Sequence, residues 1–212
     1  MSKSTINICI PVFNEEKNIK KLYEDLKIKI SDLEKKYDIS LKIVFFDDGS
    51  SDNSRQILEK LKDIELLHVE ENKGLGNAIR ELCMHSKEAK VNGMFKVDGD
   101  GQMDLDDLDK FLENDMHTSK DVIYGNRFHK SSNYKMPLHR RFGSKIFKIF
   151  LKLFSINISD PTNGFIYLSK KYLANSKIIG NYNAAQQILL DAKLRNLKID
   201  EVDINLKQRS EG

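Results

Sequence analysis

Short runs of β-branched and aromatic residues alternate with helical patterns along the first half of this chain. These runs predict five strands, at Ile6–Val12, Leu41–Phe46, Glu65–Val69, Met94–Val97 and Val122–Tyr124. Apolar residues spaced by three and four predict a long helix that ends near Leu33 and carries Glu15 and Glu16 in its first turn, then helices over about 53–61 and 76–86. Alternating strands and helices favour a doubly wound α/β fold with a parallel sheet.

The first four predicted strands all end in polar or glycine-rich motifs. In chain order these are Pro11-Val12-Phe13-Asn14-Glu15-Glu16, Asp47-Asp48-Gly49-Ser50-Ser51-Asp52, Asn72-Lys73-Gly74-Leu75-Gly76 and Asp98-Gly99-Asp100. Any one of these motifs could serve only as a turn or a helix N-cap. Because ligands bind at the carboxyl ends of strands in such sheets, their shared position favours a binding site.

The fourth motif offers two carboxylates, one residue apart, at the end of an apolar run. Asp98 and Asp100 could hold one hard cation, and the glycines let a bulky ligand come close. A calcium-binding loop is a competing interpretation, but it requires Gly and Glu where this chain has Met103 and Asp109. An acidic turn with Asp104 as a helix N-cap is the other alternative.

Composition narrows the classes of protein further. The chain has 212 residues, 40% of them hydrophobic, which suits one globular domain. Its net charge of +3 does not indicate a nucleic-acid partner. No apolar run approaches the roughly 20 residues of a membrane span, and the start of the sequence leaves no room for a signal peptide, so we expect a cytoplasmic protein. Cys9 and Cys83 are expected to be small buried apolar residues.

The two glycines of Gly74-Leu75-Gly76 raise the alternative of a dinucleotide-binding oxidoreductase. The third glycine of that fingerprint would fall at Ile79, and the motif follows the third predicted strand rather than the first. The sequence therefore disfavours this alternative.

Taken together, the motifs resemble the family 2 glycosyltransferases, and specifically the dolichol-phosphate mannosyltransferase and polyprenyl-phosphate sugar transferase branch. Besides the four strand-end motifs, the resemblance rests on Gly125-Asn126-Arg127, Asp160-Pro161-Thr162-Asn163-Gly164-Phe165, Glu201-Val202 with Ile204, and Arg209 to Gly212. It implies the GT-A fold, a doubly wound, mostly parallel sheet in a single domain over 1–212. About 1–128 would bind the nucleotide sugar and metal, and about 129–212 the acceptor.

The resemblance also implies site residues for an inverting transfer from a nucleotide-sugar donor. Donor-binding residues would be Pro11, Phe13, Glu15, Phe46, Asp48, Lys73, Asp98, Gly99 and Arg209. A Mg²⁺ or Mn²⁺ cofactor would be held by Asp98, Asp100 and Gln102, in keeping with the oxygen ligands these ions prefer. Asp100, Arg127 and Asp160 would be catalytic; Arg127 could alternatively form only a surface salt bridge.

The chain departs from the family pattern at the acceptor side. Many relatives carry a carboxylate in the helix before the last strand, whereas this chain has Gln187, which cannot accept a proton. An acceptor that is already anionic needs no general base, so the substitution favours a polyprenyl phosphate over a saccharide hydroxyl. Asp160 remains as a base, an acceptor-orienting carboxylate or a turn residue. A catalytically silent nucleotide- or cation-binding module is the remote alternative.

A basic amphipathic helix is predicted over 138–154. Arg141, Lys145, Lys148 and Lys152 form one stripe, and the other positions are largely apolar. Such a helix can lie on an anionic membrane, which would make the protein peripheral on the inner face, or it can pack on the sheet with a solvated basic face. Relatives continue past the position of Gly212 into a Ser-Lys pair that helps to hold the donor phosphates. The sequence is therefore a fragment or lacks that lysine.

Overall fold

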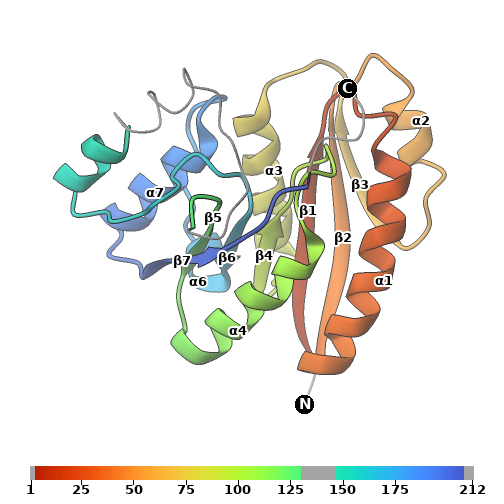
Figure 1. Cartoon of the computed structure of the whole chain (residues 1–212). Coiled ribbons are helices and arrows are strands. Elements are labelled where there is room, and N and C mark those ends of the chain that lie inside the picture. The colour runs from red at the N-terminus through yellow and green to blue at the C-terminus, as the bar shows by residue number, and fades with distance from the viewer. Residues whose placement is uncertain (1–2, 130–146, 208–212) are drawn as a thin grey trace.

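One seven-stranded sheet runs through both halves of the chain in the computed structural model, which describes residues 3–129 and 147–207 (Figure 1). The strands are β1 (Ser4–Val12), β2 (Ile39–Asp48), β3 (Ile64–Val69), β4 (Gly93–Lys96), β5 (Val122–Asn126), β6 (Ile166–Ser169) and β7 (Ile199–Asp203). The helices are α1 (Ile19–Tyr37), α2 (Ser54–Leu58), α3 (Leu75–Glu88), the 3₁₀ helix η1 (Leu105–Asp107), α4 (Leu108–Thr118), α6 (Lys170–Leu173) and α7 (Ala184–Leu194). Residues 147–153 are also helical.

The predicted parallel arrangement of the first four strands is confirmed. The strand order is β3-β2-β1-β4-β6-β5-β7, and β1 pairs in parallel with both β2 and β4. Pro11 lies opposite Phe46 and Val12 opposite Asp47, so β1 and β2 end at the same edge of the sheet. The motifs that follow these strands therefore meet at one edge.

Two strands of the second half were not among the predicted ones. β6 lies antiparallel between β4 and β5, and β7 pairs in parallel with the outer side of β5. β6 has only four residues, and β7 reads Ile-Asp-Glu-Val-Asp, which is too polar to predict a strand from local sequence. The sheet is mostly parallel, as expected, with β6 as the exception.

Helices cover both faces of the sheet and enclose two hydrophobic clusters. On one face, α1 and α4 pack on the strands through residues such as Leu26 and Phe111. On the other face lie α3, α6 and α7, represented by Leu82, Tyr172 and Ile188. Figure 1 shows α1 and α4 together in front of the strands, with α3 behind them. This three-layer packing leaves the carboxyl ends of the strands as the uncovered edge.

Two predictions about the early helices were wrong in detail. α1 begins at Ile19, so Glu15 and Glu16 lie in the turn that precedes it. Glu16 instead accepts hydrogen bonds from the backbone N–H and the side chain of Asn53, and Ser54 accepts the backbone N–H of Glu15. α2 ends at Leu58 because the next turn tightens into hydrogen bonds between residues three apart.

The two cysteines are buried, as expected, on the α3 face of the sheet. Burial raises the pKa of the Cys9 thiol to about 12. Across the described residues, no helix combines the length and the apolar character that crossing a membrane requires.

Candidate active site

A cleft of about 290 Å³ opens where β1, β2 and β4 end. It combines residues from all four predicted strand-end motifs: Pro11, Val12, Phe13, Glu15, Asp48, Asn72, Gly74, Leu75, Ala78, Asp98, Gly99 and Asp100. Seven of these are residues expected from the resemblance: Pro11, Phe13, Glu15, Asp48, Asp98, Gly99 and Asp100. The other five lining residues, Val12, Asn72, Gly74, Leu75 and Ala78, were not among the expected site residues, although all but Ala78 belong to the strand-end motifs.

Asp48 ties the second strand end to the third. Its side chain is nearly fully buried, and its two carboxylate oxygens accept the backbone N–H groups of Lys73 at 3.0 Å and Gly74 at 2.8 Å. Gly74 has a φ of 90°, a conformation that favours glycine. Asp48 thereby fixes the loop that leads into α3 while remaining part of the cleft wall.

Two other expected donor residues lie elsewhere, and a third is not described. Phe46 is 2% exposed and belongs to the hydrophobic cluster beneath the cleft that also contains Ala78. The side chain of Lys73 is exposed, and its backbone N–H donates to Asp48. Arg209 falls outside the described residues. Phe46 therefore sits where it can support the wall of the cleft from the core.

The two acidic residues at the end of β4 lie on the floor of the cleft. Asp98 forms an ion pair with Lys96, and Asp100 accepts the backbone N–H of Gln102 at 3.0 Å. Gln102 is not among the residues that line the cleft, and its carbonyl accepts the N–H of Lys207.

This acidic pair fits a cation that takes only part of its coordination from protein. Within residues 3–129 and 147–207, no group of three or more His, Cys, Asp or Glu side chains could hold a metal. Mg²⁺ often binds through one or two carboxylates, with substrate phosphates and water completing its shell. Asp98 and Asp100 supply that number of carboxylates in the wall of the cleft.

Arg127 and Asp160 form a buried bidentate pair. The guanidinium donates to the two carboxylate oxygens at 2.5 and 2.9 Å, and also to the hydroxyl of Thr162 at 3.1 Å. Asp160 is fully buried and also accepts the backbone N–H of Arg127. Both oxygens are thus engaged, and the geometry favours Asp160 as the residue that orients Arg127.

Gln187 has a structural task that a carboxylate could not perform. Its carbonyl oxygen accepts the backbone N–H groups of Ile179 and Gly180, at 3.0 and 2.9 Å. Its amide nitrogen donates to the carbonyls of Gly180 and Tyr182, at 3.2 and 2.7 Å. Because an ionised carboxylate only accepts hydrogen bonds, Glu could make the first two contacts but not the last two.

The loop that Gln187 holds also packs against the start of α3. The carbonyl of Asn181 accepts the N–H of Gly76 at 2.8 Å, and a Cβ added at Gly76 would lie 2.8 Å from the Cα of Asn181. Gly76 must therefore lack a side chain for this approach. The contact joins the second half of the chain to the helix that borders the cleft.

Comparisons with known proteins agree with this arrangement. The model of the family described as glycosyl transferase family 2 matches residues 7–176. The chain is 30% identical to the UDP-N-acetylglucosamine–dolichyl-phosphate N-acetylglucosaminyltransferase of Methanococcus voltae, covering 96% of this chain and 86% of that protein. It is 26% identical to the dolichyl-phosphate β-glucosyltransferase ALG5D of Trichomonas vaginalis, covering 94% and 64%.

The fold is also shared with solved structures. Glucosyl-3-phosphoglycerate synthase from Mycobacterium tuberculosis, in complex with Mn²⁺, UDP and phosphoglyceric acid, superposes with a TM-score of 0.69 at 16% identity, covering 99% of this chain and 72% of that one. The sheet therefore has the GT-A architecture that the resemblance implies. On the family match and the Methanococcus relative, this chain belongs to glycosyl transferase family 2.

Proposed function

We propose that this glycosyltransferase moves a sugar from a nucleoside diphosphate to a polyprenyl phosphate, with the help of a divalent cation. The single observation that carries the proposal is the similarity over nearly the whole chain to an enzyme named for a dolichyl-phosphate acceptor. The engaged amide of Gln187 supports it, because a phosphate acceptor requires no carboxylate base at that position.

The cleft residues divide between the donor and the cation. Pro11, Phe13, Glu15 and Asp48 contact the base and ribose, with Phe46 behind them and the Lys73–Gly74 loop at the edge. Asp98 and Asp100, together with Gln102, would hold Mg²⁺ or Mn²⁺ for the diphosphate, and Gly99 would allow close approach. Arg209, which lies outside the described residues, would add a positive charge. When bound, the cation neutralises negative charge on the departing nucleoside diphosphate.

Arg127 and Asp160 act beside the reacting groups. The guanidinium of Arg127 offers a planar set of N–H donors to phosphate oxygens, which suits an anionic acceptor or leaving group. Asp160 holds that guanidinium in place through the two short hydrogen bonds described above. The phosphate oxygen of the acceptor then attacks the anomeric carbon directly, with inversion.

The proposal predicts a metal-dependent transfer into a lipid product. A thermal-shift screen of UDP-, GDP- and dTDP-sugars with Mn²⁺ first identifies the donor, since a ligand that binds the native state raises the melting temperature. The radiolabelled donor is then incubated with farnesyl phosphate, with farnesol as the neutral control. We expect label in the organic-solvent extract only with farnesyl phosphate and Mn²⁺ or Mg²⁺. Label in a water-soluble saccharide product instead would favour a hydroxyl acceptor.

We further propose that the helical segment 147–153 and the residues beside it contact an anionic membrane. Of the predicted 138–154 helix, residues 138–146, including Arg141 and Lys145, lie outside the described residues. In the described part Leu151 is buried, whereas Ile149 is 65% and Leu153 is 78% exposed. The exposed rings of Phe150 and Phe154 lie 5.0 Å apart. Together with Lys148 and Lys152, these side chains combine apolar and cationic character, as interfacial helices do.

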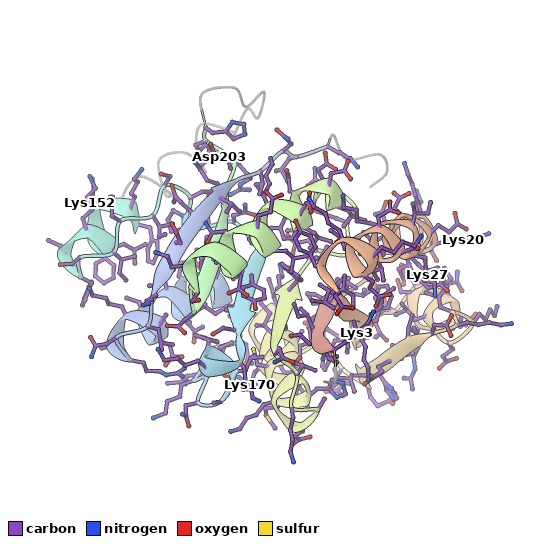
Figure 2. The ribbon with its side chains drawn as sticks, turned by 90° about the horizontal axis from the view of Figure 1, so that it is seen from below. Lys3, Lys20, Lys27, Lys152, Lys170 and Asp203 are labelled. Atoms are coloured by element: carbon purple, nitrogen blue, oxygen red, sulfur yellow. The ribbon has the colours of Figure 1, made fainter. Side chains whose placement is uncertain are left out.

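The same segment lies at one end of the molecule. Figure 2 shows Lys152 at the periphery, across the molecule from Lys20 and Lys27 of α1. In Figure 1 the segment, in teal, lies at the opposite end from α2. A membrane could therefore contact it without covering α1 or β3.

Replacing Phe150, Leu153 and Phe154 together by Ser is expected to weaken binding to anionic vesicles by about a hundredfold or more, since each buried apolar side chain contributes about 1.5–3 kcal/mol. Sedimentation with phosphatidylglycerol vesicles measures the change. Ile28→Ser, which removes a similarly exposed apolar side chain from α1 (68% exposed), is the matched control and should leave binding unchanged. Equal sedimentation of the triple variant and the wild type would exclude this surface as the membrane contact.

A further inference from the structure

We infer that a second cavity beside the donor cleft receives the phosphate of the acceptor, and that Lys96 binds it. This inference rests on the proposed function. The cavity measures about 250 Å³ and shares Leu75 and Asp98 with the cleft. The rest of its wall comes from Ile79, Lys96, Thr162, Gly164, Ile166, Asn183, Ala184, Ala185 and Gln186. An acceptor in this cavity would thus lie next to a donor in the cleft.

Lys96 is an unusual residue for its position. It is the last residue of β4, its side chain is 1% exposed, and it points to the same face of the sheet as Met94, toward α3 and α7. A buried ammonium group is costly unless it is paired. Asp98 supplies that pairing, and it is the one partner that the described part of the chain gives to Lys96. An ammonium group has three N–H donors, so further donors remain for a ligand in the cavity.

The double use of Asp98 creates a need for a second anion. When Asp98 serves a divalent cation together with Asp100, its negative charge is shared between the cation and Lys96. The positive charge of the buried Lys96 ammonium is then only partly neutralised by Asp98, and an anionic group that enters the cavity supplies the missing negative charge. The acceptor phosphate is the anion that the proposed reaction brings to this place. Lys96 would therefore favour acceptor binding after the donor and cation have bound.

One other feature of the wall, the start of α7, suits an oxyanion. The N-terminus of α7, an 11-residue helix, faces the cavity through Ala184, Ala185 and Gln186, and its N-cap Asn183 makes no side-chain capping hydrogen bond. Helix N-termini present N–H groups and a partial positive charge to anions. On another side lies Thr162, whose hydroxyl accepts from the guanidinium of Arg127 at 3.1 Å and donates to Asp160 at 3.2 Å, so it adds no further donor for the oxyanion.

Gly164 lets the backbone of its loop pack closely against Lys96 and Asp98. A Cβ added there would lie 2.6 Å from the Oδ2 of Asp98 and would also collide with the ammonium group of Lys96. The backbone of the Asp160–Phe165 motif can approach the ion pair only because this residue has no side chain. The loop that positions Arg127 therefore also closes over Lys96.

The test is equilibrium binding of farnesyl phosphate and farnesol to the full chain saturated with UDP and Mn²⁺. The wild type should prefer farnesyl phosphate, and Lys96→Met should weaken farnesyl phosphate about tenfold or more while leaving farnesol unchanged, since a charge-assisted hydrogen bond is lost. Lys171→Met, at a largely exposed lysine paired with Asp121, is the matched control and should bind as the wild type does.

Steady-state kinetics distinguish binding of the acceptor phosphate by Lys96 from a role in which Lys96 only neutralises the charge of Asp98. Lys96→Met should raise the KM for farnesyl phosphate by a larger factor than the KM for the donor. A raised donor KM or Mn²⁺ requirement with unchanged acceptor binding would overturn the inference, because the lysine would then serve Asp98 alone. A defect confined to UDP-glucuronate, relative to UDP-glucose, would also overturn it and assign the cavity to a sugar carboxylate.

Failure of the inference and failure of the proposed function give different results. If wild type and Lys96→Met bind farnesyl phosphate equally and the wild type transfers sugar to it, only the inference fails. If the wild type binds UDP and Mn²⁺ but neither binds farnesyl phosphate nor transfers sugar to it, the polyprenyl-phosphate function fails, and the inference fails with it.

Discussion

Asp100→Asn is expected to lower kcat/KM for sugar transfer by about a thousandfold or more, equivalent to roughly 4 kcal/mol of transition-state stabilisation. Asp100 lines the cleft beside Asp98, and together they are the carboxylates that the segment after β4 contributes to its wall. In the structure the carboxylate of Asp100 accepts the N–H of Gln102 at 3.0 Å. The side-chain carbonyl of asparagine can accept the same N–H, so the loop should keep its conformation. The substitution thus removes the charge that is proposed to hold the cation while keeping a side chain of nearly the same size.

The measurement is transfer at increasing Mn²⁺ concentration, together with UDP binding in the presence and absence of Mn²⁺. Asp100→Asn should lose the Mn²⁺-dependent part of UDP binding and keep the metal-independent part. Asp106→Asn is the matched control, since Asp106 is a nearby carboxylate whose 81% exposed side chain pairs with Lys29. Wild-type activity in Asp100→Asn would remove this residue from the site. Equal inactivity of the wild type and the variant with every donor would favour the silent binding module.

The parts of the site that local sequence could predict are those set by strand ends. A parallel strand, its polar terminus and the following turn are all contiguous in sequence, so Asp48 and Asp98 could be assigned to one edge before their contacts were known. Periodicity does not reveal which side of a strand end faces the ligand. Phe46 illustrates this limit. Because side chains alternate along a strand, Phe46 lies on the same face of β2 as Val44 and is buried with it in the cluster on the α3 side of the sheet.

The acceptor side of the site could not be predicted in the same way, because it is built from contacts between residues distant in sequence. The position of β6 between β4 and β5 brings the loop at 160–165 over Lys96, although some 60 residues separate them in sequence. Nothing local to Lys96 distinguishes a buried cation from an exposed one. In the same way, the departure at Gln187 could be read only as a missing base until its four hydrogen bonds to the 179–182 loop were seen.

Asp160→Ala is expected to lower the free energy of unfolding by about 3–5 kcal/mol, because it leaves the guanidinium of Arg127 buried without its counter-charge. Asp160 is fully buried and Arg127 has a 13% exposed side chain, so water can replace little of the lost pairing. For a chain of this length such a loss corresponds to a fall in melting temperature of roughly 10 °C. Thermal unfolding followed by circular dichroism, without ligands, measures it.

Comparing the free energy of unfolding with the transfer activity of the variants separates an orienting role of Asp160 from a catalytic one. Asp38→Asn, at an 85% exposed carboxylate paired with Lys3, is the control and should change the free energy of unfolding by less than about 0.5 kcal/mol. If Asp160 orients Arg127, Asp160→Ala and Arg127→Ala should both be destabilised. The double variant should then lose much less than the sum of the two, because no charge is left unpaired. A near wild-type melting temperature of Asp160→Ala together with lost activity, without a shared effect of Arg127→Ala on stability, would contradict the orienting role and favour a direct catalytic role for Asp160.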